Sequence, residues 1–124
     1  MNIRILVVDD HAVVRQGYAA LLRVLLPEVQ VIEACDGEEA LRMFRRHSEE
    51  LCLAVVDVIM PGLDGPSWVG KALETRPGTR TVFMSGYAEE QLRKSIDIDN
   101  VNFLPKPFSV QELAEAVRKT LSEN

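Results

Sequence analysis

Five side chains along the sequence could together handle a phosphoryl group. The adjacent carboxylates Asp9 and Asp10 follow the apolar run "ILVV", and the single carboxylate Asp57 follows the apolar run "LAVV". A hydroxyl, Ser85, and an amine, Lys106, follow two later apolar runs. A carboxylate at the end of a strand suited to burial costs free energy unless it binds a partner or reacts. The residue types therefore suggest a site for chemistry.

The chemistry that these groups suit is metal-assisted phosphoryl transfer. Three carboxylates brought close together repel one another, and they remain ionised together when a cation joins them. Oxygen ligands with open positions suit Mg²⁺, which retains waters and accepts phosphoryl oxygens. Asp57 would then be the nucleophile, while Ser85 and Lys106 would donate to phosphoryl oxygens and offset charge in the transition state.

Each of these residues, taken alone, also has a purely structural interpretation. An aspartate pair after a strand often begins a helix, and a lone aspartate often caps a turn. A lysine such as Lys106 is usually a surface residue, and we interpret His11 and His47 in the same way rather than as ligands or bases. The chemical interpretation is favoured by the shared position of the polar residues, each at or just beyond the carboxyl end of a predicted strand.

The elements that must position these residues follow an alternating pattern. Short apolar runs predict strands at 3–8, 29–34, 53–58, 79–85 and 101–104, and each is followed by a helical pattern. The fourth helix is predicted over 88–96, Asp36 is predicted to cap the second, and Ser109 with Glu112 forms a capping box for the last. The pattern predicts a flavodoxin-like doubly wound (βα)5 fold, an α/β protein with a five-stranded parallel sheet and helices on both faces. All strands would then end at one edge of the sheet, where ligands bind in such folds.

Length and composition restrict the class of protein. The 124 residues, 47% hydrophobic and 27% charged, predict one soluble domain over 1–124 with no output domain. No run resembles a transmembrane helix or a secretory signal, so we expect a cytoplasmic location and no membrane contact. The net charge of −5 argues against direct nucleic-acid binding. Cys35 and Cys52 are predicted to be buried, unpaired thiols.

Four motifs resemble a known family. "ILVVDD", "VVDVIMPGLDG", "FMSG" and "FLPKPF" are similar, in order and spacing, to the receiver domains of two-component response regulators, and the resemblance covers nearly the whole chain. It implies that Asp57 is the phosphoacceptor. It also implies that Asp9, Asp10 and Asp57 bind Mg²⁺ together with the backbone carbonyl of Ile59.

The resemblance also implies a switch. Ser85 would be the switch hydroxyl, Lys106 the phosphate-sensing lysine and Phe103 the switch aromatic, with a cis peptide bond at Lys106–Pro107. Such a domain takes its phosphoryl group from a histidine kinase or a histidine phosphotransfer protein. It catalyses only its own phosphorylation and dephosphorylation, so it is not an enzyme in the ordinary sense. The downstream partner would bind the fourth helix, fifth strand and fifth helix, roughly residues 88–121.

Several alternatives remain open at this stage. The chain could be a stand-alone regulator, or a receiver domain from a hybrid histidine kinase or a longer response regulator. It could also be a binding module with the same fold and no phosphorylation. An aspartyl phosphatase would carry a second acid two residues beyond the nucleophile, where this chain has Ile59. A flavin carrier would need a loop rich in hydroxyls and glycines where this chain has "DDHAVV".

Overall fold

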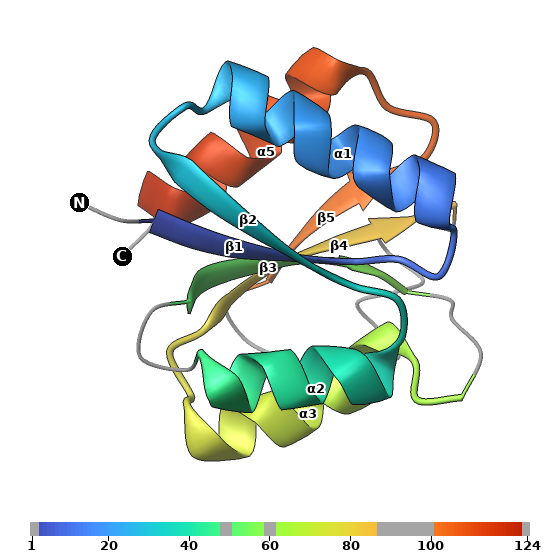
Figure 1. Ribbon diagram of the computed structural model, residues 1–124, viewed down its shortest axis with the longest axis vertical. Helices are drawn as coiled ribbons and strands as arrows, with labels where there is room; N and C mark the ends of the chain where they lie inside the picture. Colours follow the sequence, from blue (N-terminus) through green and yellow to red (C-terminus); the bar gives the residue numbers. More distant parts are fainter. Residues whose placement is uncertain (1–2, 48–50, 59–61, 87–100, 123–124) are drawn as a thin grey trace.

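The computed structural model describes residues 3–47, 51–58, 62–86 and 101–122. Its centre is a five-stranded sheet with the strand order β2-β1-β3-β4-β5, in which every neighbouring pair is parallel (Figure 1). This is the flavodoxin-like arrangement, with the order reversing at β1. The predicted fold class is therefore confirmed.

The elements lie close to the predicted ranges. The strands are β1 (Ile3–Val8), β2 (Val29–Ala34), β3 (Leu51–Asp57), β4 (Arg80–Ser85) and β5 (Val101–Pro105). The helices are α1 (Ala12–Leu25), α2 (Gly37–Arg46), α3 (Gly65–Thr75) and α5 (Val110–Ser122). The helix expected over 88–96 lies outside the described residues. No helix in the described part of the chain is both long enough and apolar enough to cross a membrane.

Helices cover both faces of the sheet, as predicted. Helices α1 and α5 lie on one face, and α2 and α3 lie on the other (Figure 1). Successive side chains of β3 alternate between two cores, Val55 joining the core under α1 and α5 and Val56 the core with α2 and α3. A strand buried on both sides must be apolar at nearly every position. This explains why the apolar run of β3 is continuous, and why its terminal carboxylate is exceptional.

Side chains fix the starts of three helices. The carboxylates of Asp36 and Asp64 accept hydrogen bonds from the backbone N–H groups of Glu39 (2.7 Å) and Ser67 (2.9 Å). Ser109 and Glu112 exchange two hydrogen bonds of 3.0 and 3.1 Å, which confirms the predicted capping box. Each cap satisfies backbone donors that the first turn of a helix cannot pair internally.

The prediction of burial for both cysteines is wrong. Cys35 is exposed and Cys52 is partly exposed. Cys35 lies one residue beyond the end of β2, so its side chain belongs to the turn before α2 rather than to the sheet. Desolvation, followed by the nearby carboxylates of Glu39 and Asp36, raises the pKa of the Cys35 thiol. The thiol is therefore held in its less reactive, protonated form.

Candidate functional site

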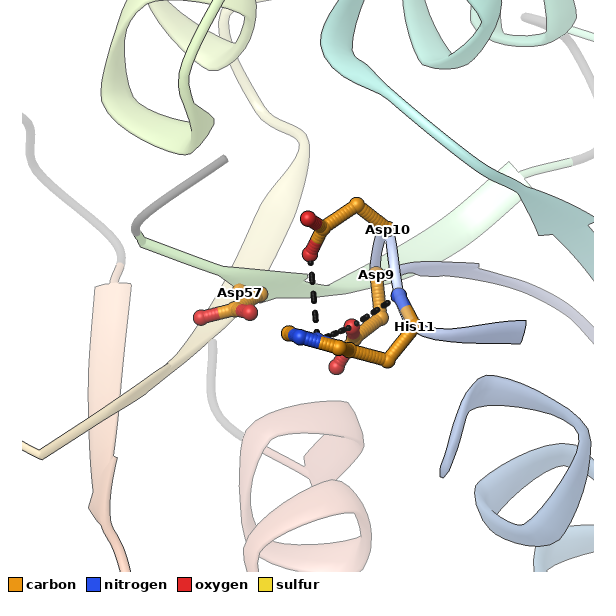
Figure 2. Close-up of side chains that lie close together, drawn as sticks. All are labelled: Asp9, Asp10, His11 and Asp57. Carbon is orange, nitrogen blue, oxygen red and sulfur yellow. Dashed lines mark hydrogen bonds and ion pairs between the residues drawn. The ribbon is translucent and has the colours of Figure 1, made fainter. Parts of the chain in front are cut away.

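The ends of three strands bring acidic and basic groups together at one edge of the sheet. Asp9 follows β1, Asp57 ends β3, and Lys106 follows β5. Asp9, Asp10, His11 and Asp57 each offer one ligand atom, and these four atoms lie within 4.8 Å of one another (Figure 2). We call these four residues the acidic pocket. The three carboxylates therefore converge at the carboxyl edge of the sheet, as predicted.

Asp9 is completely buried, with half of its carboxylate unsatisfied. Its Oδ1 atom accepts a 2.8 Å hydrogen bond from the backbone N–H of His11, whereas its Oδ2 atom has no hydrogen-bond partner. Asp10 Oδ1 is buried without a hydrogen bond as well, although the His11 Nδ1 atom lies 3.2 Å from it. Leaving buried anionic oxygens without donors is costly, so these atoms fit a bound cation better than a purely structural role.

The aspartate pair does not serve as the cap of α1. The residue at the cap position is His11, and it makes no side-chain capping hydrogen bond. The loop is instead held by Arg15, which donates to the Asp9 carbonyl oxygen (3.0 Å) and pairs with Glu33 on β2 (3.2 Å). The alternative interpretation of Asp9 and Asp10 as a helix start therefore leaves Asp9 Oδ2 and Asp10 Oδ1 unexplained.

Lys106 lies beside Asp57. The Asp57 side chain is 6% exposed, and its Oδ1 atom lies 3.4 Å from the Lys106 ammonium nitrogen. The backbone N–H of Lys106 donates to the Ser85 carbonyl oxygen at 2.7 Å, which continues the pairing of β4 with β5 beyond the last strand residue. The Lys106–Pro107 peptide bond is cis, as the family resemblance implied.

The structure describes two of the three remaining predicted site residues, Ser85 and Phe103. Ser85 is buried at the end of β4, one residue beyond Met84, which is the register partner of Asp57. Phe103 is partly buried, and its ring stacks on that of Phe83 with centroids 5.9 Å apart. Ile59, the fourth predicted metal ligand, lies outside the described residues.

Two glycines hold the loop that follows Asp57. A Cβ atom at Gly65 would lie 2.6 Å from the Asp57 carbonyl oxygen, and one at Gly37 would lie 1.9 Å from the Leu63 carbonyl oxygen. Both contacts are with backbone, so only glycine fits at these positions. These roles were not predicted from the sequence, although each glycine follows an aspartate that caps a helix, in "CDGEEA" and "LDGPSW".

Two side chains lie near the carboxylates of the acidic pocket: His11, which is one of its four residues, and Tyr18. The His11 side chain is 67% exposed, which agrees with its interpretation as a surface residue, but its Nδ1 atom also lies close to both Asp9 and Asp10. Tyr18 on α1 has a pKa above its ordinary value, mainly because of burial and additionally because of the Asp9 and Asp57 carboxylates. The negative potential of the pocket thus extends to α1.

Comparison with known proteins assigns the family. The response regulator receiver domain family matches residues 5–118, and the chain belongs to it. The chain is thus a receiver domain of the two-component type, a kind of domain that is not a conventional enzyme, and its acidic pocket is of the kind found at phosphoacceptor sites. This is the class that the motifs indicated.

Particular relatives differ in architecture. The chain is 36% identical to the sensor kinase CckA of Brucella abortus over 120 residues, which are 96% of this chain and 12% of that protein. It is also 36% identical to the transcriptional activator protein ExaE of Pseudomonas putida, covering 95% of this chain and 55% of ExaE. The chain therefore spans about half, or much less, of the length of these curated relatives.

Solved structures agree with this assignment. The receiver domain of the hybrid histidine kinase CckA is 39% identical, with a TM-score of 0.81 and coverage of 96% of this chain and 99% of that one. The NarL receiver domain of Mycobacterium tuberculosis is 28% identical, with a TM-score of 0.83 and coverage of 99% and 98%. A CheX–CheY–BeF3–Mg complex from Borrelia burgdorferi is 25% identical, with a TM-score of 0.83 and coverage of 98% and 90%.

Proposed function

We propose that Asp57 is the residue that accepts the phosphoryl group. The observation that carries this proposal is the position of Asp57, buried between an unsatisfied carboxylate pair and an ammonium group. The donor would be a phosphohistidine of a histidine kinase or of a histidine phosphotransfer protein. The domain would catalyse this transfer itself and, in the same pocket, the later hydrolysis.

We propose Mg²⁺ as the cation, held by Asp9, Asp10, Asp57 and the backbone carbonyl of Ile59. The oxygen donor set fits this ion, and the partnerless Asp9 Oδ2 atom provides a ligand that folding has left free. When bound, Mg²⁺ would neutralise the carboxylates and accept a phosphoryl oxygen. The Borrelia burgdorferi complex named above contains Mg and BeF3, which makes the same ion the natural choice for a test.

The side chains of the chain itself would perform the transfer. A carboxylate oxygen of Asp57 attacks phosphorus, the P–N bond to the donor imidazole breaks, and the released imidazole nitrogen keeps the electron pair. Lys106 starts 3.4 Å from Asp57 and would move its ammonium group to a phosphoryl oxygen. The Ser85 hydroxyl would donate to another, and burial of Asp57 limits the access of competing water.

The signal would pass through Ser85 and Phe103. A phosphoryl group that binds one conformation better than another by a few kcal/mol shifts the population decisively. Charge-assisted hydrogen bonds to Ser85 and Lys106 supply energy of that order. The responding surface would include β5 and α5, together with the helix expected over 88–96.

Helix α1 is the surface that we propose for docking of the phosphoryl donor. Among the described residues, the exposed large hydrophobic side chains are Val13, Val14 and Val24, which are 83%, 41% and 76% exposed and all belong to α1. Apolar side chains on a solvent face often mark a protein contact. Since α1 begins beside the acidic pocket, a donor helix bound there would bring its phosphohistidine to Asp57.

We further propose that these events take place in the cytoplasm.

Phosphorylation with acetyl phosphate tests the proposal without a cognate kinase. The native chain, Asp57→Asn and Asp64→Asn would be incubated with acetyl phosphate and Mg²⁺, and the intact mass measured. Asp64 caps α3 in the loop that follows Asp57, and asparagine also caps helices, so Asp64→Asn is the matched control. We expect one added phosphate on the native chain and on Asp64→Asn, and none on Asp57→Asn.

Two other outcomes would contradict the proposal. Equal phosphate gain by Asp57→Asn would place the acceptor elsewhere. No gain by the native chain, with Mg²⁺ present, would favour the alternative of a binding module without phosphorylation.

A further inference from the structure

The His11 ring lies at the acidic pocket in a position that its exposure alone does not explain. Its Nδ1 atom is 3.1 Å from Asp9 Oδ1 and 3.2 Å from Asp10 Oδ1 (Figure 2). The nitrogen therefore stands between the two carboxylates that the proposed function assigns to a cation. An imidazole nitrogen is itself a strong metal ligand.

The spacing of these atoms suits one coordination sphere. Neighbouring ligands at about 2.1 Å from an octahedral ion lie about 3.0 Å apart, close to both distances from the His11 nitrogen. All four ligand atoms of the pocket lie within 4.8 Å, so small side-chain movements would bring them to a common ion. The buried Asp9 Oδ2 atom, which has no hydrogen-bond partner, independently indicates that something binds there.

The backbone around His11 leaves the ring free to act as a ligand. The backbone N–H of His11 holds the Asp9 carboxylate at 2.8 Å, so the orientation of Asp9 does not depend on the ring. The side chain is 67% exposed, so the ring can turn toward an ion at little cost in packing. The ring nitrogen is within hydrogen-bonding distance of Asp9, and with an ion bound the same nitrogen would offer its lone pair as a ligand.

We propose that His11 is a nitrogen ligand of the acidic pocket and that it raises the affinity of the pocket for first-row transition metal ions relative to its affinity for Mg²⁺. This inference rests on the cation site of the proposed function and adds a ligand to it. Mg²⁺ is a hard ion that prefers oxygen and retains waters, so it gains little from an imidazole. An ion such as Co²⁺ binds imidazole well, so the mixed nitrogen and oxygen set favours it.

Titration of two metals into matched variants tests this inference. The chain has two histidines, and His47 lies beside Arg4, near the start of β1 and the opposite edge of the sheet, so His47→Gln is the control for His11→Gln. We expect His11→Gln to weaken Co²⁺ binding by about tenfold or more, which is the scale for perturbing a metal site. Mg²⁺ binding should change by less than about threefold, because its ligands are oxygens. The His47→Gln variant should bind both metals as the native chain does.

A spectroscopic measurement identifies the ligand directly. Bound Co²⁺ is paramagnetic, so a coordinated imidazole gives strongly shifted ring-proton resonances in the NMR spectrum. We expect shifted resonances from one histidine in the native chain and in His47→Gln, and none in His11→Gln. Thermal unfolding of the three proteins without metal controls for folding, and equal midpoints are expected because the His11 ring is exposed.

The outcomes separate this inference from the proposed function. If Mg²⁺ binds and the ratio of Co²⁺ to Mg²⁺ affinity is the same in the native chain and His11→Gln, the inference is wrong and the magnesium site stands. If neither metal binds the native chain, the proposed cation site and the inference both fail. If Asp57→Asn retains full affinity for both metals, the ions occupy another site, which also overturns both.

Discussion

The polar groups at the two edges of the sheet differ in how they are paired. The amino edge is where the parallel strands begin, and the carboxyl edge is where they end. At the amino edge, Arg4 donates to Gln30 and is within hydrogen-bonding distance of His47, and Arg80 donates to the Leu121 carbonyl oxygen. Buried polar atoms without a partner also occur on that side, in Arg76 and Thr81, but within the described ranges no carboxylate oxygen is among them. At the carboxyl edge, the buried oxygens left without hydrogen bonds belong to the carboxylates of Asp9 and Asp10.

The difference separates polar groups that find a partner within the folded chain from polar groups that do not. The interactions of Arg4 and Arg80 at the amino edge form within the chain, so they stabilise the fold without a ligand. Among the described residues, the carboxyl edge gathers the carboxylates of Asp9, Asp10 and Asp57, and Lys106 places a positive charge beside Asp57. A buried charge without a partner is retained when a ligand supplies the missing interaction. This contrast predicts that substitutions at the two edges will have different kinds of effect.

The largest effect on stability is expected at Gly65. Replacing Gly65 with alanine would place a methyl group 2.6 Å from the Asp57 carbonyl oxygen, and the backbone there would have to move. We expect a loss of about 2–3 kcal/mol in unfolding free energy, as in other overpacked sites, and slower phosphorylation because Asp57 is displaced. Urea unfolding and the acetyl phosphate assay measure the two effects.

Gly70 in the same helix provides the matched control. A Cβ atom at Gly70 meets nothing within 4 Å, so Gly70→Ala should stabilise the protein by about 0.5–1 kcal/mol through helix propensity. If both alanine variants behave alike, close packing of the loop after Asp57 does not position the site.

The next largest effect is expected for Asp9→Asn, and its sign should depend on magnesium. Removing one of the clustered carboxylates should stabilise the metal-free protein by about 1–2 kcal/mol, because repulsion and the cost of a buried charge are relieved. The native chain should instead gain about 2.7 kcal/mol at a Mg²⁺ concentration one hundred times the Kd, whereas the variant should gain almost nothing. Unfolding midpoints with EDTA and with Mg²⁺ provide the comparison. A destabilised variant in EDTA would show that the carboxylate is structural.

A smaller effect is expected at Tyr18, whose raised pKa reports the charge of the pocket. Because its pKa is above the value in the unfolded chain, the stability that it contributes is present below about pH 10 and is lost as pH rises further. Tyr18→Phe should therefore lose stability less steeply than the native chain between about pH 9 and 11. Mg²⁺ in the pocket should lower the Tyr18 pKa toward its ordinary value, which carbon NMR of the ring can follow. An unchanged pKa would mean that the ion binds away from Asp9 and Asp57.

The smallest effect is expected at the amino edge. Arg4→Ala removes two interactions: an exposed hydrogen bond to Gln30 and a partly buried contact with His47. We expect a loss of about 1 kcal/mol or less in unfolding free energy, and no change in phosphorylation or in Mg²⁺ affinity. A reduced phosphorylation rate in this variant would show that the amino edge also affects the site, contrary to the proposed difference between the two edges.

The sequence predicted the layout of the fold and part of the site. The five apolar runs identified the strands within two residues, since a parallel strand buried on both faces has a nearly continuous apolar pattern. The convergence of Asp9, Asp57 and Lys106 followed from topology alone, because parallel strands end at one edge. The roles assigned to these residues stay predictions, as do those assigned to Asp10, Ile59, Ser85 and Phe103.

Features that depend on the path of a loop could not be predicted in this way. The exposure of Cys35, the position of the His11 ring and the close approach at Gly65 are set by backbone angles just beyond strand ends. Hydrophobic periodicity carries no information about such turns. The paired "DG" sequences were a usable signal for the glycines, since each combines a capping aspartate with the first residue of a helix.

Titration with beryllofluoride tests the central claim most directly. This phosphoryl mimic would be added with and without Mg²⁺, and the backbone amide resonances of the native chain and Asp57→Asn recorded. If the carboxyl edge is a cation-assisted phosphoryl site, the amides of Ser85 and Lys106 shift and saturate in the native chain only when Mg²⁺ is present, and Asp57→Asn shows no saturating shift. Saturating shifts of the same amides in Asp57→Asn, or none in the native chain with Mg²⁺, would contradict the account.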